Sequence, residues 1–236
     1  MNSQLVPGII GGMGPEATID LMNRIYINTV ASDDSGHLRV LVDNNPKIPS
    51  RIKAIIEGTG ESPAPCMIAM GNGLINQGAD FLVIPCNTAH YYYGEVSKSL
   101  SVPVVNLLEI TVEEIKKNNN VRVGLLGSTA LRIVNLYDPV FTKYGLIPIY
   151  PEDDYQEKLM DLIKAVKANN ITKEHLDFIP LLLNHMKTKN IDSFAIVCTE
   201  LSVIKSKIIS DLPIFDASEI LTMEIIKRAT KIKPNL

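Results

Sequence analysis

The segment Phe81-Leu-Val-Ile-Pro-Cys-Asn-Thr-Ala-His90 joins a run of strand-forming apolar residues to a cysteine and then to polar residues that can open a helix. A second segment of the same design, Phe194-Ala-Ile-Val-Cys-Thr-Glu-Leu201, lies 112 positions later (198 − 86). In open parallel sheets, ligands bind just beyond the carboxyl ends of the strands. We therefore expect Cys86 and Cys198 to belong to the active site.

Two further landmarks repeat in the same order. Gly124-Leu-Leu-Gly-Ser-Thr129 matches Gly8-Ile-Ile-Gly-Gly-Met13 at an offset of 116 (124 − 8). Leu212-Pro-Ile-Phe-Asp-Ala-Ser-Glu219 matches Val102-Pro-Val-Val-Asn-Leu-Leu-Glu109 at an offset of 110 (212 − 102). Unrelated α/β domains also share apolar strands that end in small residues, but here a proline and a glutamate match as well. The slowly drifting offset therefore indicates an internal duplication.

Short apolar runs alternate with segments of helical periodicity, which predicts parallel sheets connected by crossover helices. The expected strands lie near 5–10, 38–42, 81–84, 102–105 and 121–126, and the expected helices begin at Pro15 or cover 65–77, 107–117 and 217–230. The predicted fold is thus two similar Rossmann-like α/β domains, 1–118 and 119–236. We expect a pseudo-twofold axis between them, with the active site in the interdomain cleft. The last helix could pack back on the first domain.

Composition narrows the function to small-molecule chemistry. The formal charge is −3 and the pI is near 5.8, with no basic run, which argues against nucleic acid or a membrane surface as partner. Three cysteines without a disulfide framework favour a reducing compartment, and the first apolar run is broken by Pro7 and Gly8, unlike a signal peptide. We expect a cytoplasmic protein with no membrane partner and a small-molecule substrate.

Two thiols on opposite sides of one bound molecule could invert a stereocentre. One thiolate removes a proton from carbon while the opposite thiol returns one to the other face. A free thiol has a pKa of about 8.5, and the N-terminus of a helix favours the thiolate and lowers that value. A redox pair would more often show the spacing Cys-x-x-Cys, and buried cysteines are often only core filler. Cys66 lacks the strand-to-helix context, so we interpret it as filler.

These motifs are similar to those of the aspartate/glutamate racemase superfamily, the cofactor-independent amino-acid racemases, and most of all to its aspartate racemase branch. The segments that carry the resemblance span most of the chain: Gly11-Gly-Met-Gly-Pro15, Asn45-Pro-Lys-Ile-Pro-Ser-Arg51, Pro85-Cys-Asn-Thr-Ala-His90 and Cys198-Thr-Glu200. The resemblance implies two catalytic cysteines, no pyridoxal phosphate or other cofactor, no metal, and a homodimer. The glutamate racemase branch has a histidine where this chain has Glu200, which argues against a racemase that acts on glutamate alone.

Carried over position by position, the resemblance makes Cys86 and Cys198 the two proton donors and acceptors. The implied substrate-binding residues are Met13, Pro49, Ser50, Arg51, Asn87, Thr88, Ala89, Lys164 and Thr199. Arg51 and Lys164 would hold carboxylates, although Lys164 lies off the apolar stripe of its helix and would otherwise be interpreted as a solvated lysine. His90 and Glu200 could assist the thiols as acid/base or orienting groups, or could simply be polar residues of a first helical turn.

The implied reaction is cofactor-independent interconversion of L- and D-aspartate by two-base proton transfer at Cα. Glutamate could be a second substrate, with its L- and D-forms interconverted in the same way. Gly12-Met-Gly-Pro-Glu-Ala17 also fits a loose dinucleotide fingerprint, with Asp43 after the second strand, so an NAD-dependent oxidoreductase is the rival enzyme. That alternative leaves both cysteine motifs unexplained, and Pro15 removes an amide that a pyrophosphate would need. A hydantoin racemase, a carbon–carbon lyase and a binding protein without catalysis also stay open as functions.

Overall fold

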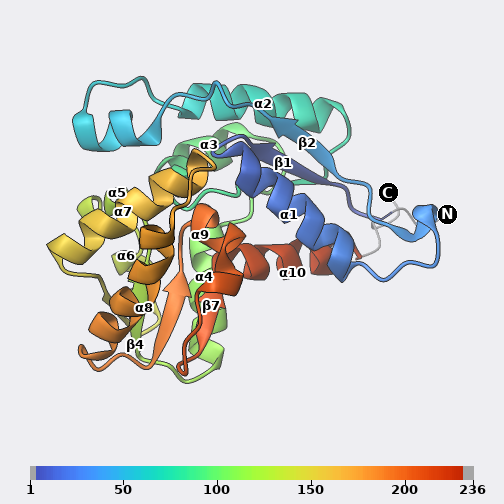
Figure 1. Cartoon of the computed structure of the whole chain (residues 1–236). Coiled ribbons are helices and arrows are strands. Elements are labelled where there is room, and N and C mark those ends of the chain that lie inside the picture. Colours follow the sequence, from blue (N-terminus) through green and yellow to red (C-terminus); the bar gives the residue numbers. More distant parts are fainter. Residues whose placement is uncertain (1–3, 231–236) are drawn as a thin grey trace. The chain divides into compact units, whose positions relative to one another are not determined.

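Parallel strands alternate with helices through the part of the chain that the structure describes, residues 4–230 of a computed structural model (Figure 1). The strands are β1 (Pro7–Gly11), β2 (Leu41–Asn44), β3 (Phe81–Val83), β4 (Arg122–Leu126), β5 (Ile147–Ile149), β6 (Ser193–Ile196) and β7 (Ile214–Asp216). The α-helices are α1 (Pro15–Asn28), α2 (Ala64–Asn76), α3 (Tyr93–Ser99), α4 (Leu107–Lys117), α5 (Thr129–Ile133), α6 (Asp138–Lys143), α7 (Asp153–Lys167), α8 (Lys173–Lys187), α9 (Thr199–Val203) and α10 (Ala217–Ala229). Short 3-10 helices cover Asp34–Gly36, Thr88–Tyr92 and Lys205–Lys207, and a π-helix covers Lys53–Glu57. None of the helices within residues 4–230 has the length and apolar character needed to cross a membrane.

The first sheet has the strand order β2-β1-β3, with all pairs parallel. Ile9 at its centre pairs with Val42 on one side and with Val83 on the other. The strand expected at 102–105 is reduced to an isolated parallel bridge between Leu82 and Val104. That segment still extends the sheet beyond β3, because Leu82 N–H donates to the Pro103 carbonyl at 2.9 Å.

The second sheet has the order β5-β4-β6-β7, again with parallel pairs. Its centre is β4, where Leu125 pairs with Ala195 of β6, and Ala195 pairs in turn with Phe215 of β7. If β4 is matched with β1 and β6 with β3, the two sheets have the same strand order, and β7 takes the place of the bridge at Val104. The expected α/β fold with two similar parallel sheets is therefore confirmed.

A repeated aspartate clamp shows the duplication at atomic level. Val6 N–H donates to Asp80 Oδ2 at 2.7 Å, and Asp80 N–H donates back to the Val6 carbonyl at 2.8 Å. Arg122 N–H likewise donates to Asp192 Oδ2 at 2.7 Å, and Asp192 N–H donates back to the Arg122 carbonyl at 2.7 Å. The offsets are 116 (122 − 6) and 112 (192 − 80), the same as those of the sequence landmarks.

The glycines of the first landmark also have equivalent packing. A Cβ atom added at Gly8 would lie 2.9 Å from the Cβ of Ala79, and one added at Gly124 would lie 2.8 Å from a methyl group of Ile191. Ala79 and Ile191 are themselves 112 positions apart (191 − 79). Because real Cβ contacts are longer than this, each central strand needs a glycine to let the chain that leads into the next strand approach it.

The residues form two compact units. One holds the chain up to Leu107 and resumes at Ser218, and the other runs from Leu108 to Ala217. Helix α4 thus groups with the second unit and α10 with the first, whereas domain boundaries near 118 stay a prediction from the sequence. The first unit has a core under β1 and β3 that includes Ile10, Met67 and Leu82, and the second has a core that includes Leu125, Phe141 and Ala195.

Candidate active site

Both cysteines follow a short parallel strand and precede a helical segment, as the sequence predicts. Strand β3 ends at Val83, Cys86 follows three residues later, and the 3-10 helix begins at Thr88. Strand β6 ends at Ile196, and Cys198 follows two residues later as the N-cap of α9. Both thiols are free and only 7% exposed. Burial next to a polar turn is suited to a thiol that meets a bound molecule rather than bulk water.

In the first unit, several predicted site residues lie together at the carboxyl ends of the strands. The predicted residues Met13, Cys86 and Ala89 are buried in one apolar cluster, which also contains Ile48. Met13 follows β1, Ile48 belongs to the loop after β2, and Cys86 follows β3. The parallel order of these strands explains why positions so far apart in sequence meet at one edge.

Arg51 connects the loop after β1 with the loop after β2 by hydrogen bonds. One terminal nitrogen of its guanidinium donates to the Met13 carbonyl at 3.2 Å, and the other donates to the Pro49 carbonyl at 3.2 Å. Close approach of the two loops also requires Gly12, which has φ +95° and where a Cβ would lie 2.2 Å from the carbonyl oxygen of Asn45. A guanidinium has five N–H donors, so a carboxylate ligand could still use the rest of this fixed fork.

His90 is buried, and backbone groups engage both of its ring nitrogens. Leu107 N–H donates to Nε2 at 3.0 Å, so the proton resides on Nδ1, which donates to the Cys86 carbonyl at 2.8 Å. Burial lowers the pKa of His90 to about 4. Of the two assisting roles expected for His90, this arrangement favours orienting the Cys86 turn, because a neutral ring with both nitrogens engaged has no proton to exchange with a thiol.

In the second unit, Cys198 is linked to two charged groups. Its Sγ–H donates to Glu200 Oε2 at 3.0 Å, within the buried first turn of α9. Glu200 Oε1 lies 3.2 Å from Nζ of Lys167, the last residue of α7, in an ion pair too poorly aligned to count as a hydrogen bond. The sequence identified Glu200 but missed Lys167. The sequence holds no signal that separates Lys167 from Lys164, because each follows a buried residue, Ile163 or Met160, by one helical turn.

The protonation state of Cys198 differs from the expectation. Burial raises its pKa well above the usual value, and the adjacent Glu200 carboxylate raises it further, while Lys167 opposes the shift. The prediction that a helix N-terminus lowers the pKa is therefore wrong for Cys198. Helix α9 is only five residues long, and its weak field is outweighed by removal of the thiolate from water. The raised pKa favours the protonated form of the Cys198 thiol.

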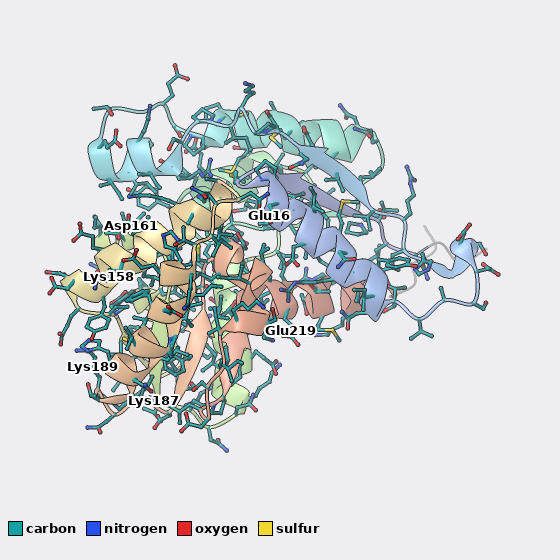
Figure 2. All side chains as sticks on the ribbon, in the orientation of Figure 1. Glu16, Lys158, Asp161, Lys187, Lys189 and Glu219 are labelled. Atoms are coloured by element: carbon teal, nitrogen blue, oxygen red, sulfur yellow. The ribbon has the colours of Figure 1, made fainter. Side chains whose placement is uncertain are left out.

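The remaining predicted residues divide between the two units. Asn87 and Thr199 are buried, Thr88 and Pro49 are half-buried, and Ser50 is exposed. Lys164 is 67% exposed and pairs with Asp161 of its own helix at 3.2 Å, and Asp161 projects from α7 in Figure 2. This is the position of a solvated lysine, so a contact of Lys164 with substrate stays a prediction. Cys66 contacts the apolar core of the first unit and accepts a long contact from Asn45 at 3.6 Å, as expected of filler.

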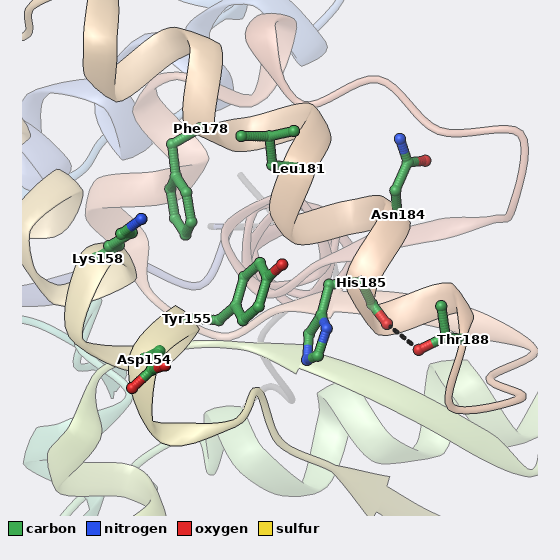
Figure 3. A pocket seen from close by; sticks show the side chains of 8 residues that line it. All are labelled: Asp154, Tyr155, Lys158, Phe178, Leu181, Asn184, His185 and Thr188. Atoms are coloured by element: carbon green, nitrogen blue, oxygen red, sulfur yellow. Dashed lines mark hydrogen bonds between the residues drawn. The ribbon is translucent and has the colours of Figure 1, made fainter.

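A groove between α7 and α8, of about 590 Å³, contains none of these residues. Tyr155 and His185 stack in it with ring centroids 3.8 Å apart, and Phe178 lies beside them (Figure 3). The groove is lined by acidic, basic and amide side chains, and these do not point towards one common position. The predicted site residues therefore lie outside this groove.

The sequence matches a known protein family. Residues 10–225 match the family described as Asp/Glu/hydantoin racemase. The chain belongs to this racemase family. It is therefore an enzyme of the isomerase kind, and the dinucleotide alternative is wrong. Consistently, Gly12 N–H already donates to Thr18 Oγ1 at 2.9 Å, which removes an amide that a pyrophosphate would use.

Three relatives illustrate the match. The broad specificity amino-acid racemase RacX of Bacillus subtilis is 30% identical over 226 residues, which cover 89% of this chain and 92% of RacX. The structure of Picrophilus torridus aspartate racemase is 31% identical with a TM-score of 0.84, covering 97% of this chain and 96% of that one. The glutamate racemase of Aquifex pyrophilus is 26% identical over 159 residues, 64% of this chain and 59% of that protein.

Within residues 4–230, no three or more His, Cys, Asp or Glu side chains gather in a way that could hold a metal ion. The polar side chains next to the cysteines along the chain are Asn87 and Thr88 after Cys86, and Thr199 and Glu200 after Cys198.

Proposed function

We propose that this racemase interconverts L- and D-aspartate without a cofactor, using Cys86 and Cys198 as the two bases. The observation that supports this most strongly is the occurrence of a free, buried cysteine just beyond each of two equivalent parallel strands. The similarity over 97% of the chain to an aspartate racemase that is 31% identical supports aspartate as the substrate. Glutamate is the second substrate to test.

The reaction exchanges one C–H bond for another. A thiolate on one face of Cα takes the α-proton, and the electron pair left on carbon delocalises into the α-carboxylate as an enediolate. A thiol on the opposite face then gives its proton to Cα. This requires each sulfur to approach Cα within roughly 3 to 3.5 Å, so we propose that the two cysteine turns flank one substrate.

The enediolate is the difficult intermediate, since an α-proton is a far weaker acid than a thiol. Donors fixed before the reaction stabilise such charge without reorganisation, and each is typically worth about 3 kcal/mol of barrier. We assign this task to backbone amides of the two turns, assisted by Asn87, Thr88 and Thr199. We assign the side-chain carboxylate of aspartate to Arg51, whose fork is already held by the Met13 and Pro49 carbonyls, and to Lys164.

A second candidate is a racemase of broader specificity. The 30% identity to RacX, a broad specificity amino-acid racemase, over most of both chains specifically favours it. The two candidates differ in how much they need a cation for the side-chain carboxylate. Arg51→Met should abolish activity on aspartate selectively if the enzyme is specific, and should shift its preference towards neutral amino acids if it is broad.

The deciding experiment incubates the purified protein with L-aspartate in deuterium oxide, without pyridoxal phosphate or metal, and follows optical rotation and α-deuterium. Racemisation with uptake of solvent deuterium is expected, and neither should occur in Cys86→Ala or Cys198→Ala. The Cys66→Ala variant is the matched control and should retain activity. Absence of exchange with aspartate and glutamate would remove the substrate assignment, and full activity in either active-site variant would remove the two-thiol mechanism.

We also propose a homodimer in a reducing compartment, the cytoplasm. Chemistry by two thiols requires that both stay reduced, and the three cysteines are free. For the dimer, helix α1 has an exposed apolar face on which Ile19, Met22 and Tyr26 follow one another at helical spacing, each at least 43% exposed. A twofold axis would pair this face with the same face of a second copy.

A further inference from the structure

The groove between α7 and α8 has a wall of aromatic rings. The rings of Tyr155 and His185 stack with their centroids 3.8 Å apart, and the Phe178 ring centroid lies 6.2 Å from that of Tyr155 (Figure 3). Leu181 also lines the groove and is 60% exposed. The volume of about 590 Å³ falls within the range of small-molecule pockets, roughly 300 to 1,000 Å³. The groove therefore offers a ligand both space and an apolar surface.

Two charges of opposite sign lie on the α7 side of the groove. Asp154 and Lys158 both line it, and they are four positions apart, a spacing at which two helical side chains can form an ion pair. Among residues 4–230, however, neither of them has an ion-pair partner, whereas Asp161 of the same helix pairs with Lys164 at 3.2 Å. Opposite charges that do not neutralise each other are suited to a ligand that carries both charges itself.

A ligand with a single charge fits the groove less well. The polar side chains do not point towards one common position, so they cannot all bind one ion (Figure 3). An anion such as a phosphate would be attracted by Lys158 but repelled by Asp154, and a cation would meet the reverse. A zwitterion avoids both penalties, because its two charged groups are separated and each can lie next to the side chain of opposite sign.

We propose that this groove is a second binding site, which takes a free amino acid with an aromatic side chain. The ammonium group of the ligand lies next to Asp154 and its carboxylate next to Lys158. Its ring covers the exposed Leu181 and meets the rings of the groove wall, which removes apolar surface from water and adds ring–ring contacts. The site is independent of the proposed racemisation, since none of the predicted site residues lines the groove.

NMR of the imidazole rings tests the location of the site. The chain has four histidines, of which His185 lines the groove. L-Phenylalanine should shift the His185 signals in a saturable way, because the ring of the bound ligand alters the magnetic field around the stacked rings. His90, whose ring nitrogens are engaged by the Cys86 carbonyl and Leu107 N–H, reports separately on binding at the Cys86 turn. If the His185 signals do not move, the proposal is overturned, whatever happens at His90.

Analogues of the ligand test which of its groups are recognised. 3-Phenylpropionate lacks the ammonium group, phenethylamine lacks the carboxylate, and L-alanine lacks the ring. Titrated against the His185 signals, each should bind more weakly than L-phenylalanine by roughly fivefold or more, which is the upper end of the effect of an exposed ion pair. Equal affinity for 3-phenylpropionate or phenethylamine would overturn the recognition of a zwitterion, and equal affinity for L-alanine would overturn the role of the aromatic wall.

Variants of the groove test the assigned contacts. Asp154→Asn, Lys158→Met and Leu181→Ser should each weaken the binding of L-phenylalanine by roughly fivefold, and the exposure of all three side chains means that the fold should be retained. Glu157→Gln and Lys173→Met, at exposed charges of α7 and α8 that do not line the groove, are the matched controls and should bind as the parent does. Urea unfolding with an unchanged midpoint verifies that each variant is folded. Parent affinity in folded Asp154→Asn and Lys158→Met would overturn the proposal.

Discussion

Stability near neutral pH should depend on His90 remaining uncharged. Both of its ring nitrogens are engaged, with Nε2 accepting from Leu107 N–H, so protonation of the ring must break that bond. The pKa of His90 is about 4 in the folded protein, against 6.5 for an unperturbed histidine. Between pH 4 and pH 6.5, His90 binds a proton in the unfolded chain but stays neutral in the folded protein. The folded state is therefore fully favoured above pH 6.5 and loses stability as the pH falls towards 4.

The size of the effect follows from the shift. A difference of about 2.5 pKa units at about 1.4 kcal/mol each gives a loss of about 3 kcal/mol by pH 4. Carboxylates titrate over part of the same range, so the measurement must isolate His90. His90→Gln removes the titrating ring while keeping an amide that can hold one of the two backbone partners. The stability difference between parent and variant should shrink by about 3 kcal/mol from pH 7 to pH 4.

Urea unfolding at a series of pH values measures this difference, and NMR of the imidazole gives the tautomer and pKa independently. The expected NMR result is a ring protonated on Nδ1 that stays neutral down to acidic pH. Two results would refute the assignment of a neutral His90 ring that bridges the Cys86 carbonyl and Leu107 N–H. One is a stability difference between parent and variant that does not change with pH, and the other is a His90 ring that titrates near 6.5.

Three further predictions concern folding and assembly. Gly12→Ala should lower the free energy of unfolding by about 2 kcal/mol or more in urea denaturation, because a side chain at positive φ is strained and its Cβ would meet the Asn45 backbone; an unchanged midpoint would contradict this. Asp80→Ala should lower the free energy of unfolding by about 1 kcal/mol, because a hydrogen bond to Val6 N–H is lost. Asp192→Ala should lower it by less, because the equivalent hydrogen bond to Arg122 N–H is more exposed. The reverse order in urea denaturation would contradict a stabilising role for these aspartates. If the proposed dimer forms through the α1 face, the double change Met22→Lys/Tyr26→Lys should give monomers in analytical ultracentrifugation, and a dimer that persists in this variant would exclude that face.

Local sequence determined the order and type of the elements. Alternating apolar runs and helical periodicities express preferences of neighbouring residues, which is why a helix was expected at 107–117 and occurs at α4, Leu107–Lys117. The duplication was also visible, because a repeated unit repeats its glycines and aspartates wherever the backbone needs them. The position of each cysteine after its strand followed from the same pattern, as did the family.

The tertiary structure decided what those residues do. Cys198 was expected to favour the thiolate from its place before a helix, but burial and a carboxylate from its own turn keep it protonated. Lys164 and Lys167 look alike in the sequence, and only the packing of α7 against α9 sets Lys167 against Glu200 while Lys164 pairs with its own helix. Folding also brought Leu107 N–H to the His90 ring, so that backbone groups engage both of its nitrogens. Such properties depend on which groups from distant segments exclude water from one another, and that is set by packing and not by neighbours along the chain.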